Sequence, residues 1–232
     1  DGGGIILDED VDAIITRTSV VDNYASGNIG GIDVMNTYTT INNVTVSRNA
    51  SGGGGGVGLT NANVDITNSI VWENTGNEVW VYSGSATVTY SDIEGGYDGE
   101  CNIDADLPFT AADHGDLTLQ VGSPCTDAGT ADTDGDGEDD ITDFYGVAPD
   151  MGAYEFFMAV TGLEYWIVST SVILAWDAIE DASYYLVERS TDAEFTTDVE
   201  SSYLQTNTST DDDLEFNTEY FYRVAAFLGY WS

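Results

Sequence analysis

The chain has no lysine, and its 232 residues carry four arginines and one histidine against 42 acidic side chains. The formal net charge is therefore −38 at pH 7. A field this negative repels nucleic-acid phosphates and anionic lipid headgroups, so we expect no nucleic-acid partner. It also opposes the compact state by self-repulsion, which high ionic strength or bound divalent cations would relieve.

Long apolar runs and cysteines are scarce as well. No apolar run approaches the roughly 18 residues of a membrane span, so we expect no direct membrane insertion in this segment. The two cysteines, Cys101 and Cys125, bracket a region with few strand signals. A disulfide between them would close a loop of about 25 residues, contribute about 3–4 kcal/mol and imply an oxidising compartment. The alternative is two unrelated buried thiols.

Three asparagines occupy the same place in three successive repeats. Each of them closes a block that opens on isoleucine and carries valine five residues later. The blocks run from Ile15 to Asn23, from Ile41 to Asn49 and from Ile66 to Asn74, and a fourth copy runs from Val88 to Gly96. Periods of 20–50 residues indicate stacked structural units.

The stacked units predict columns of identical side chains. A short apolar alternation with the period of a strand precedes each block, as in Ile32/Val34 and Val57/Leu59. Like residues of successive coils would then lie on one another, and the three asparagines would form a hydrogen-bonded ladder. The two predicted aliphatic columns are Ile15, Ile41, Ile66 and Val88, and Val20, Val46, Val71 and Ile93.

This pattern resembles the right-handed parallel β-helix repeats of secreted bacterial proteins, the pectate-lyase-like group, over residues 1–158. The resemblance implies an all-β chain that begins with a solenoid. Segments after the repeats look like the closing part of large bacterial surface proteins built from such coils, notably Gly122–Gly129 and Asp150–Glu155. The same scaffold carries lyases, glycosidases, adhesins and stalks, so the fold does not select the function.

Residues 159–232 predict a second, different unit. Short strand-like runs, Val172–Trp176 and Tyr184–Ser190 among them, resemble a fibronectin type III β-sandwich. In that resemblance Trp176 is the core tryptophan, and Leu214 and Tyr220 form the tyrosine corner. The last strand of the sandwich is missing from the pattern. We therefore expect an ordered fragment of a larger exported protein, or a strand donated by a neighbouring copy.

The acidic run from Asp132 to Asp143 has the spacing of a calcium loop. Alternate carboxylates surround Gly137, where such a loop must turn sharply, and this pattern resembles the loops of dockerins. It departs from them at Asp143, where glutamate is usual, and at Asp139, where an aliphatic residue is usual. The alternative is a solvated acidic loop. The candidate calcium ligands are Asp132, Asp134, Asp136, Glu138, Asp140 and Asp143.

Aromatic residues of the last two coils, Trp72, Trp80 and Tyr82, could stack on pyranose rings or could cover the coil end against the next segment. No catalytic or cofactor-binding residues emerge. A lyase needs a basic cluster beside calcium, whereas Arg17 and Arg48 occupy different places in their coils. The acidic residues Asp33 and Asp65 are expected on outward strand positions, and His114 on the surface.

These patterns favour a non-enzymatic extracellular structural or adhesive module of a larger cell-surface protein, possibly a subunit of a surface layer, stalk or filament. Its expected partners are other copies or other surface proteins, and possibly polysaccharide. The alternative is the non-catalytic end of a secreted polysaccharide lyase or glycosidase, or a carbohydrate-binding module.

Overall fold

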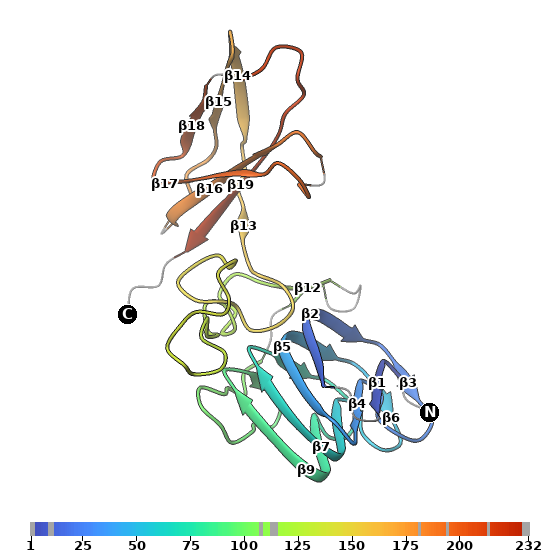
Figure 1. The fold of residues 1–232 in the computed structure, drawn as a ribbon. Helices are drawn as coiled ribbons and strands as arrows, with labels where there is room; N and C mark the ends of the chain where they lie inside the picture. Colours follow the sequence, from blue (N-terminus) through green and yellow to red (C-terminus); the bar gives the residue numbers. More distant parts are fainter. Residues whose placement is uncertain are drawn as a thin grey trace. The chain divides into compact units, whose positions relative to one another are not determined.

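The computed structural model describes residues 3–8, 12–106, 109–111, 116–180, 182–193, 195–212 and 214–228. Within these ranges every regular element is a β-strand, and no helix occurs. The chain divides into two compact units, Asp1–Phe156 and Phe157–Ser232. Figure 1 shows the strands of both units.

The first unit is a β-solenoid of about three turns, with its strands stacked in parallel (Figure 1). In one column β1 (Ile5–Asp8), β4 (Ile32–Met35), β7 (Val57–Thr67) and β9 (Val79–Thr89) follow one another. A second column contains β2 (Ala13–Val21) and β5 (Tyr38–Ser47), and β5 pairs onward with β7 and with β8 (Ile70–Trp72). The short strands β10 (Asp92–Ile93), β3 (Tyr24–Ala25) and β6 (Ala50–Ser51) complete the coils.

The register between coils matches both predicted aliphatic columns. Ile41 lies opposite Ile15 on one side and Ile66 on the other, and Ile66 lies opposite Val88. The second column pairs Val20 with Val46, Val46 with Val71 and Val71 with Ile93. Both columns belong to one apolar core. Full burial of such a side chain contributes about 1.5–3 kcal/mol, so stacking provides the stability that a single coil lacks.

The bends of the coils are single residues with positive φ that recur at equivalent positions. Asn43 and Asn68 have φ of 51° and 50°, and Asn36 and Asn61 have φ of 56° and 52°. Asparagine adopts this left-handed conformation more readily than most residues, which explains why it recurs at these bends. Arg17 precedes Asn43 in its column of bends, whereas Arg48 lies in a different column. The two arginines therefore form no cluster, as predicted.

Residues after β10 fold back over one face of the coils. This closing segment includes the antiparallel pair β11 (Phe109–Ala111) and β12 (Asp116–Leu119), and the rest of its described part is irregular. Its buried side chains, among them Leu117, Leu119 and Met151, form a second apolar cluster with Ile70 and Trp72 of the coils.

Glycine permits the closest approach of the closing segment to the coils. Gly152 has φ of 100°, and a Cβ atom there would lie 2.7 Å from Ile70 Cδ1. Its N–H donates to the Asn68 carbonyl at 2.8 Å, and Asn43 Nδ2 donates to the Asp150 carbonyl at 2.9 Å. The bend asparagines therefore attach the closing segment to the stack.

The second unit contains two antiparallel sheets. One has the order β13 (Met158–Ala159), β19 (Phe221–Leu228), β16 (Ala182–Ser190) and β17 (Glu200–Leu204). The other has the order β14 (Glu164–Val168), β15 (Ser171–Ala175) and β18 (Thr208–Asp211). Trp176 is buried in their common core, where its ring lies edge-on to that of Tyr185 with the two ring centroids 5.3 Å apart.

The stretch that contains Leu214 and Tyr220, the residues of the predicted tyrosine corner, is not a strand. Residues 214–220 are turn and irregular backbone, and the strand begins only at Phe221. Tyr220 Oη accepts the N–H of Glu215 at 3.2 Å, which closes this turn. Residues 229–232 lie outside the described residues, so the expected absence of the last strand stays a prediction.

Candidate functional site

The three repeat asparagines form a continuous ladder through the coils. Asn23 Nδ2 donates to Asn49 Oδ1 at 2.9 Å, and Asn49 Nδ2 donates to Asn74 Oδ1 at 3.0 Å. Each acceptor oxygen also receives the backbone N–H of the asparagine in the preceding coil, at 3.0 and 2.9 Å. The side chains thereby satisfy backbone donors at the bend in successive coils.

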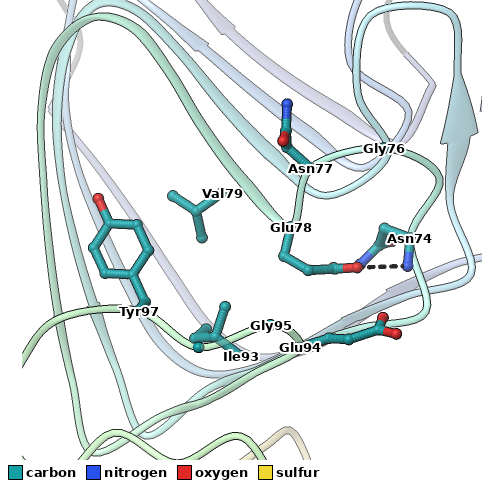
Figure 2. A pocket seen from close by; sticks show the side chains of 10 residues that line it. Asn74, Gly76, Asn77, Glu78, Val79, Ile93, Glu94, Gly95 and Tyr97 are labelled. Carbon is teal, nitrogen blue, oxygen red and sulfur yellow. Dashed lines mark hydrogen bonds between the residues drawn. The ribbon is translucent and has the colours of Figure 1, made fainter.

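Glu78 ends this ladder. The next coil has Gly96 in the asparagine position, and the Glu78 carboxylate takes the place of the missing amide oxygen. Oε1 accepts the Asn74 N–H at 2.9 Å, and Oε2 accepts Asn74 Nδ2 (Figure 2). Burial raises the pKa of Glu78 to about 7, and Glu94 adds to the rise while the bonds from Asn74 oppose it.

A pocket of about 430 Å³ lies beside this ladder end. Val79, Ile93 and Tyr97 provide its apolar lining, and Glu78 and Glu94 provide carboxyl groups (Figure 2). Glu94 Oε2 also accepts the N–H of Glu73 at 2.7 Å. Glu94 contributes to the raised pKa of Glu78, and the Glu78 carboxylate already accepts both donors of Asn74. The geometry therefore suits the end of a ladder better than a catalytic pair.

The acidic loop brings three of its six candidate ligands together. Carboxylate oxygens of Asp132, Asp134 and Asp136 lie within 4.8 Å of one another. Among the described residues, these three form the cluster of acidic side chains that could hold a metal ion. Asp132 also accepts the N–H groups of Gly135 at 2.7 Å and Gly137 at 2.9 Å. Three converging carboxylates supply the hard oxygen donors that calcium prefers, although six to eight oxygens are needed in total.

The other three candidate ligands do not join this group. Asp140 Oδ2 accepts the Thr133 hydroxyl at 2.6 Å, and this bond lowers the pKa of Asp140. Asp143 forms an ion pair with Arg17, whose hydrogen bond lowers the pKa of that carboxyl. Glu138 donates its backbone N–H to Asp136 at 2.8 Å, and its own carboxylate lies outside the group of three. Asp140 and Asp143 thus organise the loop and attach it to the first coil.

Buried carboxyls also organise the closing segment around the Asp150–Glu155 motif. Asp150 Oδ1 accepts the Asp127 N–H at 2.7 Å, and Glu155 Oε1 accepts the Asp150 N–H at 3.0 Å. Burial raises the pKa of Asp150 to about 8, with a further contribution from Glu155. This motif therefore has a structural basis: its acidic side chains satisfy backbone donors of the turns that cover the coils.

The predicted disulfide is wrong for this structure, in which both cysteines are free. Cys125 is buried in the second apolar cluster, where its Sγ donates to Asp92 Oδ2 at 3.2 Å. Cys101 is exposed at a bend with φ of 52°, beside Tyr90. The two thiols thus occupy different environments, and burial raises the pKa of Cys125.

The structure separates the three candidate stacking aromatics. Trp72 is buried among the side chains of the closing segment, so its ring is not available to a sugar. Trp80 and Tyr82 lie together on β9, with ring centroids 5.9 Å apart, and Tyr82 is 71% exposed. Of the three candidates, Tyr82 therefore offers the most aromatic surface to solvent, whereas Trp80 is half-buried.

Asp33 was expected in solvent, and this expectation is wrong. The side chain is buried, and burial raises its pKa while a hydrogen bond from Asn28 opposes the rise. Asp65 is half-buried. His114 lies outside the described residues.

Further polar columns follow the spacing of the repeats, although they were not predicted. Asn61 Nδ2 donates to Asn36 Oδ1 at 3.0 Å, and these residues have the same separation as Asn49 and Asn74. Glu78 had no comparable signal, because its role depends on the absence of a further asparagine.

No family model matches the sequence, and no curated protein matches it significantly. Among the described residues, no helix has the length and apolar character needed to cross a membrane.

Proposed function

We propose that the chain is a non-enzymatic structural or adhesive module of a larger secreted, cell-surface protein, such as a subunit of a surface layer, stalk or filament. Its partners in this role are other copies, other surface proteins or polysaccharide. The observation that carries the proposal is the ladder from Asn23 to Glu78, because it joins successive coils through buried side-chain hydrogen bonds. Such a column resists separation of the coils, which a load-bearing element requires.

The first unit, in this proposal, is a right-handed β-helix of the pectate-lyase-like type from a bacterial surface protein. The second is a fibronectin type III-like connector, a class supported by its two antiparallel sheets and its buried Trp176.

Calcium is the proposed cofactor of the module. Asp132, Asp134 and Asp136 would hold the ion, with backbone carbonyls and water completing the oxygen shell. A divalent cation would offset the repulsion among neighbouring carboxylates in a chain of net charge −38. Its role is to stabilise the closing segment, which Arg17 and Asp143 connect to the first coil.

A carbohydrate-binding role is a second candidate, favoured by one observation. The half-buried Trp80 and the exposed Tyr82 form an aromatic pair on β9, and paired rings of this kind can stack on the apolar face of a pyranose. This candidate differs from the first because glycan binding through these rings would itself be the function.

One experiment separates these roles. The protein is titrated with polygalacturonate, cellulose oligomers and chitin oligomers by calorimetry, and each mixture is assayed for reducing ends and unsaturated uronides. If the role is structural, no polysaccharide is cleaved. Trp80→Ala then binds each glycan as the unaltered protein does. Release of product would overturn the structural proposal, and saturable binding abolished by Trp80→Ala would favour the second candidate.

A further inference from the structure

Strand β14 is an unprotected edge of its sheet. It pairs with β15 in an unbroken antiparallel register, from Glu164 opposite Ala175 to Val168 opposite Ser171. Among the described strands it pairs with no other. Alternate N–H and C=O groups along its other side therefore face outward, ready to pair with another chain.

The same strand exposes apolar side chains on both of its faces. Tyr165 lies opposite the buried Leu174 and therefore on the core-facing side, yet Tyr165 is 68% exposed. Ile167, on the same face, is also 68% exposed. Trp166 and Val168 add exposed apolar surface on the opposite face. Exposed apolar side chains gathered along an edge strand indicate an interaction site.

β14 lacks lysine, proline and a β-bulge, three of the usual protections of an edge strand. Proteins guard edges with lysine, proline, inward charges or a β-bulge. β14 reads Glu-Tyr-Trp-Ile-Val, its register contains no shift, and the chain has no lysine. The single charged residue, Glu164, stands at its beginning.

We propose that β14 pairs with β14 of a second copy of this chain, antiparallel about a two-fold axis at Trp166. In this register Trp166 faces Trp166 of the second copy, Tyr165 faces Ile167, and Glu164 faces Val168. Each residue meets one of the same parity, so the outward peptide groups of the two strands meet in register. The two three-stranded sheets become one continuous sheet.

Self-pairing is favoured because the strand is complementary to itself. Tyr165 and Ile167 form an aromatic–β-branched pair on each side of the axis, a combination that stabilises antiparallel sheets. The two Glu164 carboxylates lie at opposite ends of the pairing, about 13 Å apart along the strands. That separation exceeds the Debye length of about 8 Å at physiological ionic strength, so the charges hardly oppose each other. Contacts of this two-fold kind are the commonest in homo-oligomers.

The net charge of −38 sets the conditions under which the pairing is observed. Two such chains repel each other at low ionic strength, and salt screens the repulsion while leaving the apolar contacts. Dimerisation therefore strengthens with added salt. The inference deepens the proposed structural function, and its failure is separable, because a monomer can still be a rigid calcium-binding module.

Sedimentation velocity of the whole chain at about 0.1 M and about 1 M NaCl tests the pairing, since the screening length falls from about 10 to about 3 Å. The unaltered protein forms a dimer in high salt. Ile167→Lys weakens the dimer at least about tenfold, because the axis repeats the substitution and places an ammonium opposite each Tyr165. Phe216→Lys is the matched control: Phe216 is 77% exposed in the same unit and lies outside the strands, so this variant dimerises normally.

Cysteine cross-linking tests the register. In a Cys101→Ser background, Trp166→Cys places the two thiols at the axis, and mild oxidation in high salt gives a covalent dimer. Phe216→Cys in the same background gives no covalent dimer. A monomer in high salt, undiminished association of Ile167→Lys, or equal cross-linking at both positions would overturn the proposal. Circular dichroism confirms that each variant is folded.

Discussion

Asn49 and Asn74 are joined through a single oxygen: Asn74 Oδ1 accepts Asn49 Nδ2 at 3.0 Å and the Asn49 backbone N–H at 2.9 Å. Asn49 Oδ1 repeats the arrangement with Asn23. Each rung therefore satisfies two donors of the coil before it, and each needs the rung after it. Glu78 completes the last rung of this series, because a carboxylate has two oxygens and can accept both donors of Asn74.

Asn49→Ala is expected to destabilise the first unit by about 3 kcal/mol. The substitution leaves buried partners in the coils on both sides without their hydrogen bonds, and each such group costs about 1–3 kcal/mol. Urea unfolding followed by tryptophan fluorescence measures the loss. Asn77→Ala, at an exposed position, is the control and changes the midpoint little. Equal, small effects of the two substitutions would contradict the ladder's role.

Glu78 predicts a specific pH dependence of stability. Its pKa in the folded chain is about 7, above the ordinary value of 4.5, so the folded state holds the proton more tightly. The resulting stabilisation is complete below about pH 4.5 and is lost as the pH rises through 7, with a total of up to about 3 kcal/mol.

Thermal unfolding of the protein and of Glu78→Gln between pH 4.5 and 8.5, in high salt, isolates this contribution. The free energy of unfolding of the variant falls less steeply across this interval, although glutamine also loses one acceptor for Asn74 and lowers stability throughout. Parallel pH profiles of the two proteins would show that Glu78 does not titrate as its burial predicts.

The acidic loop predicts stabilisation by calcium. A ligand that binds only the folded state contributes about 2.7 kcal/mol at a hundred times its dissociation constant. Asp136→Asn removes one of the three converging carboxylates and is expected to weaken binding at least about tenfold. Asp139→Asn removes the same charge from the same loop, outside the group of three, and is the matched control. Calorimetric titration measures the calcium affinity of both variants. An equal loss of affinity in the two would show that net charge alone is responsible.

The free cysteines predict one reactive thiol in the folded protein. Cys101 is exposed and reacts with a thiol reagent under native conditions. Cys125 is buried, and its raised pKa keeps it in the unreactive thiol form until the chain unfolds. Counting thiols with and without denaturant checks this. If both sulfurs stay unreactive in the denatured, unreduced protein, the two cysteines form a disulfide after all.

The coil architecture was predictable because its signal is repetitive. Each coil has an aliphatic residue at the position of Ile41. The residues stacked on Ile41 are its equivalents in the neighbouring repeats, so the spacing alone determines the register. The burial of Trp72 had no such signal, since the segment that covers it follows later and has no period. Sequence reasoning left this alternative open, and only packing decides it.

The acidic loop shows the limit of spacing arguments more clearly. Asp132, Asp134 and Asp136 converge because they are separated by single residues within one turn. Asp143 stands where a twelfth-position ligand would, but Arg17 of the first coil engages it. That pairing joins residues far apart in the sequence, so the local motif could not predict it. Cys125 and Asp92 form another such pair, and the expected disulfide was wrong for the same reason.

Light scattering and negative-stain microscopy, first with calcium in high salt and then after chelation, test the structural role most directly. We expect discrete assemblies of two or more copies with calcium, and a lower unfolding temperature with looser assembly after chelation. A monomer of unchanged stability under both conditions, together with saturable binding or cleavage of a polysaccharide, would contradict it.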